Sequence, residues 1–186
     1  MADQQAGAGQ GPRPVRAPRR ITAEYLHRAA LHYLERYSVP AAQLRRVLAR
    51  KIAASCRHHG DDPEQHAAAL DAVIARCVAT GLVDDRRFAE ARAATLRRKG
   101  QSRRAVAARL AAKGVTRELA SELATPEAGE EKAAALVAAR RRRIGPWREA
   151  SQRTAYRQKD LAALARLGFD FATARSVIDG DPEGEA

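Results

Sequence analysis

The 186-residue sequence is poor in cysteine and in aromatic residues, and it contains no long apolar run. Cys56 and Cys77 are the two cysteines, and Phe, Trp and Tyr together make up 4% of the chain. Two cysteines without a regular framework argue against a disulfide-stapled secreted domain. No secretory leader pattern and no stretch of about 20 apolar residues, as a membrane-spanning helix requires, is present. We therefore expect a cytoplasmic protein that does not associate with membranes.

Patterns that carry enzymatic chemistry are also missing. No serine or cysteine stands in a nucleophile-elbow pattern, and no glycine-rich turn could cradle a phosphate. Cys56, His58, His59, His66 and the more distant Cys77 offer a possible zinc site, but structural zinc sites use two well-separated ligand pairs, and the second pair is lacking. We therefore expect no catalytic activity, no metal and no cofactor.

Two aspartate pairs, Asp61–Asp62 and Asp84–Asp85, could in principle bind magnesium. Each pair stands directly before a predicted helix, where carboxylates are stabilised by unpaired backbone N–H groups and by the helix dipole. Helix capping is therefore the preferred interpretation of both pairs.

Positive charge and alanine are what the sequence has in excess. The 34 Lys and Arg residues outnumber the 22 Asp and Glu residues, which gives a formal net charge of +12. This excess predicts a polyanionic partner or an acidic protein surface. Large apolar residues are sparse, but they recur at helical spacing among alanines, and no alternating strand pattern is present. We expect an all-α protein with thin helices around small cores.

Capping residues divide the chain into three triplets of predicted helices. The expected helices are 22–37, 40–55, 63–80, 85–99, 103–113, 117–124, 130–143, 155–167 and 171–178. The corresponding division is a disordered basic tail at 1–20, three-helix units at 21–81, 82–125 and 126–180, and an acidic tail at 181–186.

The second and third triplets share a joint that recurs after 54 residues. In each copy a leucine is followed four residues later by a glycine, then by an apolar residue and a capping residue. The glycine is expected to be left-handed, so that the apolar residue can fold back on the leucine. Chance similarity in an alanine-rich chain is the alternative. The first triplet is expected to lack this joint and to carry a polar surface loop, "CRHHGDDPEQH", in its place. The two copies are Leu110, Gly114, Val115 and Thr116, and Leu164, Gly168, Phe169 and Asp170.

The stretch "VDDRRFAEA", residues 83–91, is interpreted as the start of the second triplet. Asp84 is expected to be the N-cap, and Val83 and Phe88 have the spacing of a hydrophobic staple across that cap. Asp85 then stands in the first turn, where its charge favours the helix.

The residues just before this stretch are expected to end the preceding helix. Gly81 would provide a left-handed end, and Leu82 would pack back on Cys77. One short segment would therefore end one unit and start the next.

The cationic residues cluster around the joints and form the predicted contact surface. The run Arg140–Arg143 occupies every side of one helical turn, so part of it must face a partner or the edge of the core. Phosphate contacts would be sequence-independent and would weaken steeply with salt. Stacking on single-stranded bases is not strongly indicated, because aromatic residues are few. The predicted contact residues are Arg86, Arg97, Arg98, Arg103, Arg104, Arg140, Arg141, Arg142, Arg143 and Arg157.

These motifs resemble those of a known family, the RecX regulatory proteins. "TGLVDDRRFAEA", followed by "RRKGQSRRAVAARLAAKGV", is similar to the family's signature region, and "KDLAALARLGFDFATARSVI" is similar to its C-terminal repeat. The likeness extends over residues 25–178, and its specific part is 81–115. The chain departs from the family at Leu82, where an aromatic residue is common, at Arg92, where a bulky residue such as Tyr often stands, and in the long loop 144–154.

The resemblance implies an elongated, curved array of three tandem three-helix repeats that lies in the helical groove of a RecA filament on DNA. It also implies a monomeric, non-enzymatic inhibitor of the recombinase, ATPase and co-protease activities of RecA, with effects on DNA repair, recombination and the SOS response. Direct binding to single- or double-stranded DNA would be weak and salt-sensitive. The alternative is a RecA-independent helical DNA-binding protein or transcriptional regulator, although the candidate recognition helices carry little Asn or Gln to read base edges.

Overall fold

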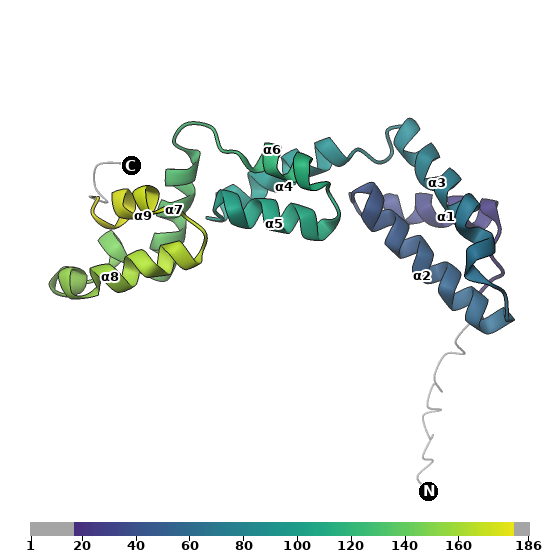
Figure 1. Cartoon of the computed structure of the whole chain (residues 1–186), viewed down its shortest axis with the longest axis horizontal. Helices are drawn as coiled ribbons and strands as arrows, with labels where there is room; N and C mark the ends of the chain where they lie inside the picture. The colour runs from purple at the N-terminus through teal and green to yellow at the C-terminus, as the bar shows by residue number, and fades with distance from the viewer. Residues whose placement is uncertain (1–16, 181–186) are drawn as a thin grey trace, which may run out of the picture.

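The computed structural model describes residues 17–180, and in this range every regular element is a helix. Figure 1 shows three groups of helices that follow one another along an elongated arch. The first group is α1 (Ala23–Leu34), α2 (Ala41–His59), η1 (Pro63–His66) and α3 (Ala67–Ala79). The second is α4 (Asp85–Arg98), α5 (Arg103–Lys113) and α6 (Arg117–Ala124). The third is α7 (Glu130–Arg142), η2 (Gly145–Trp147), α8 (Ala150–Arg166) and α9 (Phe171–Ile178). The predicted all-α, curved array of three-helix repeats is confirmed.

Side-chain caps fix most helix starts where the sequence predicts them. The side chains of Ser102, Thr116 and Asp170 accept N–H groups in the first turns of α5, α6 and α9, and these helices have the predicted bounds. In contrast, α8 begins at Ala150, five residues before the predicted start, because nothing in the sequence from 150 to 155 interrupts a helix.

Residues 18–20 lie against the first group instead of belonging to a tail. Ser55 Oγ donates a hydrogen bond to the carbonyl oxygen of Arg19 at 2.8 Å, and Arg20 forms an ion pair with Asp61 at 3.2 Å. The predicted end of the basic tail, at residue 20, is therefore too late in the chain. Its remaining part before residue 17, and the predicted acidic tail, lie outside the described residues.

Each group of helices has a small hydrophobic core of its own. Leu26, Leu44 and Leu48 are fully buried in the first core, whereas the part of α7 buried in the third core presents only alanines. Burial of a leucine side chain contributes about 1.5–3 kcal/mol, and an alanine contributes much less. Small cores of this kind leave an important role to the contacts between the groups.

The glycine joint ends the middle helix in all three groups and not in two only, and the same turn ends α4 at Gly100, where the N–H of Gln101 bonds to the carbonyl oxygen of Leu96 at 3.1 Å. Gly60, Gly114 and Gly168 end α2, α5 and α8 with positive φ angles of 75°, 102° and 91°. In each copy the residue after the glycine donates its N–H to the carbonyl oxygen five residues earlier, at 3.2, 3.2 and 3.3 Å. The three bonds join Asp61 to Cys56, Val115 to Leu110, and Phe169 to Leu164.

The expectation that the first triplet lacks this joint was therefore wrong. Cys56, His58 and His59 form the last turn of α2, so the first half of the predicted polar loop is helical. The joint is harder to recognise there because a buried cysteine replaces the leucine and Asp61 replaces the apolar residue after the glycine.

The same joint brings the middle helices of successive groups end to end. At the end of α5, a guanidinium nitrogen of Arg46 in α2 donates to the carbonyl oxygen of Lys113 at 2.8 Å. At the end of α8, Ser102 Oγ, the cap of α5, donates to the carbonyl oxygen of Leu167 at 2.7 Å. The C-terminal carbonyl groups of one helix thus meet the N-terminal turn of the helix before it, an arrangement that the helix dipoles favour.

Carboxylates from the next group complete both contacts. Asp85 Oδ1 accepts the N–H of Ala41, the first residue of α2, at 2.7 Å. Both carboxylate oxygens of Glu131 lie 3.0 Å from the N–H of Arg103, the first residue of α5. Asp85 was expected only to favour its own helix, and the fold instead uses it to cap a helix of the preceding group.

The segment between the first and second groups differs from the prediction at Leu82 and Val83, and the staple predicted between Val83 and Phe88 is not observed because the two residues belong to different cores. Leu82 is exposed, whereas Val83 is buried in the first core and donates its N–H to the carbonyl oxygen of Cys77 at 3.1 Å. Val83 therefore takes the position predicted for Leu82. Asp84 caps α4 through the N–H of Arg87, as predicted, and Phe88 packs against the second core.

Gly168 provides a test of the end-to-end contact. A Cβ atom at Gly168 would lie 2.8 Å from Ser102 Oγ and 3.2 Å from Arg104 Cβ, whereas a Cβ atom at Gly129, which has a similar φ of 86°, would meet nothing within 4 Å. Both Gly→Ala substitutions should destabilise the protein by about 1 kcal/mol through the positive φ. Gly168→Ala should lower the free energy of unfolding by roughly 1–3 kcal/mol more, because the added methyl group overpacks the contact. Equal losses in urea unfolding would contradict the importance of this contact.

Candidate partner and nucleic-acid interface

Positive charge is concentrated on the middle helix of each group. Together α2, α5 and α8 carry thirteen Lys and Arg residues and a single carboxylate, Asp160. Asp160 is 2% exposed and does not offset the surface charge. The first and last helices of the groups carry eight carboxylates. The fold therefore separates charge in a way that the overall composition does not reveal.

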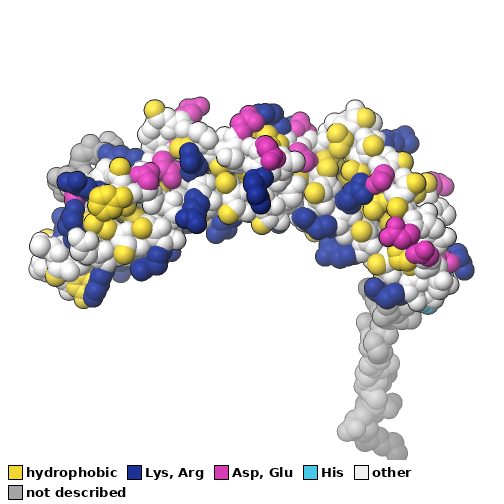
Figure 2. Space-filling view, viewed as in Figure 1, with side chains coloured by type: hydrophobic (Ala, Val, Ile, Leu, Met, Phe, Trp, Pro, Cys, Tyr) yellow, Lys and Arg dark blue, Asp and Glu magenta, His cyan; other side chains and the backbone are white. Residues whose placement is uncertain are grey.

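The separation is visible on the surface of the arch. Figure 2 shows Lys and Arg side chains along the lower, concave side, where α2, α5 and α8 lie in Figure 1, and several Asp and Glu side chains along the upper, convex side. On α5, the exposed side chains of Arg104 and Arg109 form no ion pair within residues 17–180, and the same holds for Arg50 and Arg57 on α2. These side chains are available to an anionic partner.

Three of the predicted contact residues have hydrogen-bond partners within the fold. Arg97 is mostly buried and donates to the carbonyl oxygens of Leu123 and Thr125 at 2.8 and 2.9 Å. Arg86 bonds to Glu122 at 2.8 Å, and both Nε and Nη2 of Arg157 bond to the Asp179 carboxylate at 2.6 Å. The interpretation of these three as contact residues is not favoured, because their guanidinium groups already have internal partners. The remaining predicted residues are Arg98, Arg103, Arg104 and the run Arg140–Arg143.

The run Arg140–Arg143 lies beside the end of α4. All four side chains are exposed, and Arg141 donates to the carbonyl oxygen of Lys99 at 3.0 Å. Arg143 has a positive φ of 53° and ends α7, so the run does not complete a helical turn. None of the four faces the core, and Arg98 is exposed on the helix against which Arg141 bonds.

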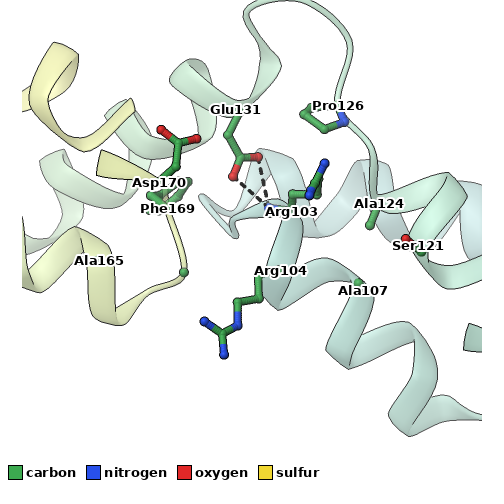
Figure 3. Close-up of a pocket in the computed structure, with 11 residues that line it drawn as sticks. Arg103, Arg104, Ala107, Ser121, Ala124, Pro126, Glu131, Ala165, Phe169 and Asp170 are labelled. Atoms are coloured by element: carbon green, nitrogen blue, oxygen red, sulfur yellow. Dashed lines mark hydrogen bonds between the residues drawn. The ribbon is translucent and has the colours of Figure 1, made fainter. Parts of the chain in front are cut away.

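Arg103 and Arg104 line a cleft of about 640 Å³ between the second and third groups. In Figure 3, Arg103 extends toward Pro126, whereas Arg104 points away from Glu131. Burial is the largest cause of a raised pKa at Glu131, and the N–H of Arg103 opposes it in part. The cleft thus combines cations with the Glu131 carboxylate, which already accepts the N–H of Arg103 at the joint between the groups.

The four aspartates considered as metal ligands have structural partners. Asp62 caps η1 by accepting the N–H of Glu64 at 3.0 Å, and Asp84 caps α4. Capping, the preferred interpretation, is confirmed for these two. Within residues 17–180, no three His, Cys, Asp or Glu side chains come close enough together to hold a metal ion. No helix in this range is long and apolar enough to cross a membrane.

A buried ion pair that the sequence did not reveal orients α8. Nε and Nη2 of Arg148 bond to the Asp160 carboxylate at 2.9 and 2.7 Å, and the N–H of Gly145 bonds to the same carboxylate at 2.9 Å. Burial alone would raise the pKa of Asp160, but these hydrogen bonds outweigh it and the pKa is lowered. The spacing of twelve residues across a turn gives no periodic signal, so pattern analysis could not find the pair.

Removal of Arg148 should destabilise the third group in a pH-dependent way. Arg148→Met leaves the Asp160 charge buried without its partner, which costs about 3–5 kcal/mol. Because the pKa of Asp160 is lowered in the folded protein, the pair stabilises the fold above the ordinary Asp pKa, and this contribution is lost as the pH falls. The difference from the unmodified protein in urea unfolding should therefore be large at neutral pH and should shrink in acid.

Arg157→Met, on α8, is the matched control for an exposed pair in the same group of helices. It removes a bidentate pair with Asp179 in which both side chains are 36% exposed. More exposed pairs contribute only about 0–1 kcal/mol. If Arg157→Met lowered the free energy of unfolding as much as Arg148→Met does, burial of the Asp160 carboxylate would not explain the effect of Arg148→Met.

Comparison with known proteins agrees with the geometry. Residues 84–123 match the family model of the second three-helix domain of RecX. Over 174 residues the chain is 41% identical to the regulatory protein RecX of Myxococcus xanthus, which covers 91% of this chain and 92% of the relative. Over 150 residues it is 30% identical to the regulatory protein RecX of Agrobacterium fabrum, which covers 81% and 79%. No solved structure matches the chain. The chain therefore belongs to the RecX family of regulatory proteins.

Proposed function

We propose that this protein binds RecA filaments along their helical groove through the concave face of the arch. Binding there would inhibit the recombinase, ATPase and co-protease activities of RecA and so influence DNA repair, recombination and the SOS response. The family as a whole regulates RecA, and membership supports RecA as the partner in general.

The observation that carries the proposal is the repeated cationic face of α2, α5 and α8. These helices follow one another end to end, each at the same place in its group, and they carry thirteen cations with one buried carboxylate. A filament presents identical protomers and DNA phosphates at regular intervals along its groove. A repeated cationic surface suits such a partner, because each repeat can make an equivalent contact.

We further propose that the protein acts in the cytoplasm as a monomer without catalysis of its own. Contacts between its arginines and DNA phosphates would release counterions, so direct binding to single- or double-stranded DNA should be weak and should fall steeply with salt. Association with the filament would add contacts to RecA, which depend less on salt where they exclude water.

The alternative of a RecA-independent DNA-binding protein is less well supported. A helix-turn-helix protein inserts the N-terminal residues of its recognition helix into the major groove. The N-termini of α2 and α5 are covered by the next group: Asp85 and Glu131 accept their first N–H groups, and Gly114 and Gly168 pack against their first turns. These two helices therefore cannot present their N-terminal turns to base edges without opening the array.

Charge reversal on α5 tests the concave face. Arg104→Glu/Arg109→Glu should weaken inhibition of the RecA ATPase on single-stranded DNA by roughly tenfold or more in a substoichiometric titration, because two cations become repulsive toward an anionic groove. Arg87→Glu/Arg117→Glu makes the same change in net charge at exposed positions of α4 and α6, and should leave inhibition nearly unchanged. No inhibition by the unmodified protein, together with tight sequence-specific duplex binding, would overturn the proposal.

A second charge reversal tests the run at the end of α7. Changing Arg140–Arg143 to Glu should weaken co-sedimentation with RecA filaments, because these exposed side chains extend the cationic surface beside α4. If inhibition is unchanged in this variant, the run is not part of the interface.

A further inference from the structure

The N-terminal group contains a hollow that combines tyrosines with cations. Three of the four tyrosines of the chain, Tyr25, Tyr33 and Tyr37, line it within one helix and the turn that follows. The hollow has a volume of about 440 Å³. Small-ligand sites have volumes of about 300–1,000 Å³, so this space is sufficient for a nucleobase. Although aromatic residues are rare in the sequence, the fold concentrates them here.

The tyrosine rings are held in place from below and open to solvent at one side. Tyr25 and Tyr33 are half-buried and pack against the first core. The Tyr33 and Tyr37 ring centroids are 4.9 Å apart with an interplanar angle of 39°, and the N–H of Tyr37 bonds to the carbonyl oxygen of Tyr33 at 3.1 Å. Tyr37 is 54% exposed. Hydrophobic packing alone does not require a large ring to stand so far out of the core.

The charged side chains that line the hollow are cations, and His32, which also lines it, lies 3.5 Å from the Glu35 carboxylate. Arg19, Arg28, Arg36 and Lys51 line the hollow, and no carboxylate does so. Arg28 forms an exposed ion pair with Glu24 at 3.6 Å, whereas the side chains of Arg36 and Lys51 have no hydrogen-bond or ion-pair partner within residues 17–180. An occupant must therefore offer negative charge together with a flat apolar face.

We propose that this hollow is a separate binding site for single-stranded nucleic acid. Bases would stack on Tyr33 and Tyr37, and the adjoining phosphates would lie against Arg36 and Lys51. Proteins that hold single strands combine a cationic groove with aromatic side chains in this way, because every base has a π-face. The site lies in the first group, apart from the cleft between the second and third, and it requires no RecA.

A single strand fits the hollow better than a duplex or an acidic peptide. The bases of a duplex are stacked on one another, so their faces cannot reach Tyr37. An acidic peptide would satisfy the cations, but it would leave the exposed Tyr37 ring without a partner. Neither alternative uses both features of the hollow.

The test compares two fluorescein-labelled oligonucleotides of equal length by fluorescence anisotropy, using the full chain without RecA. One is oligo-dT and the other is an abasic strand with the same phosphates. The unmodified protein should bind oligo-dT at least 5-fold more tightly, because each stacked base adds a contribution that phosphates alone cannot supply. Phosphate binding elsewhere on the cationic surface affects both strands equally.

Substitutions in the hollow identify the stacking rings. Tyr33→Leu/Tyr37→Leu keeps apolar volume but removes the rings, and it should weaken oligo-dT binding about 5-fold or more without changing the abasic affinity. Tyr37→Trp should retain tight binding of oligo-dT, since a larger ring can also stack. Tyr156 is the fourth tyrosine of the chain and lies on α8, outside the hollow. Tyr156→Leu is therefore the matched control and should change neither affinity. Circular dichroism establishes that each variant is folded.

Two outcomes would overturn the proposal. One is equal affinity of the unmodified protein for the two strands, which would leave phosphate attraction as the whole of the binding. The other is unchanged oligo-dT affinity in the double leucine variant. If that variant also bound RecA filaments less tightly, the hollow would be a protein contact instead of a nucleic-acid site.

Discussion

The array depends on the contact between the N-terminus of one middle helix and the C-terminus of the next. Helix ends carry unpaired N–H and carbonyl groups, and a buried end without partners is costly. At both joints a carboxylate accepts the first N–H group of one middle helix, and the last carbonyl groups of the next middle helix accept hydrogen bonds beside a left-handed glycine. Asp85 and Glu131 take the same part in successive joints although they differ in length and in sequence position. Because each core is small, these joints maintain the curved order of the groups.

The same joints account for the distribution of charge. Carboxylates that cap a neighbouring helix, such as Asp85 and Glu131, or that hold an arginine, such as Asp160, are engaged inside the structure. The cations of the middle helices are mostly not engaged in this way. Internal use of the acids therefore leaves the concave side positive, and an anionic partner can be attracted without a pocket or a catalytic centre. A regulator that acts by contact requires this kind of surface.

The two proposed modes of recognition differ in their physics and in their place on the arch. The concave face offers charge repeated along an axis, which suits a polymeric partner and tolerates the loss of any one contact. The hollow beside α1 offers Tyr25 and Tyr33, which pack against the first core, and the exposed Tyr37, which contacts Tyr33, and it suits one flexible strand. Salt should weaken the first mode more than the second, because stacking does not depend on counterion release.

The sequence by itself determined the helices and most of their ends, because caps such as Thr116 and glycines such as Gly114 act on the nearest few residues. It also contained the third copy of the joint at Gly60, although Cys56 and Asp61 disguised it. Tertiary structure decided which charges are available: Arg97 is turned inward, and Asp160 and Arg148 meet through a turn. Caps and turns are local, whereas the partner of a long flexible side chain depends on which helix end the fold brings beside it.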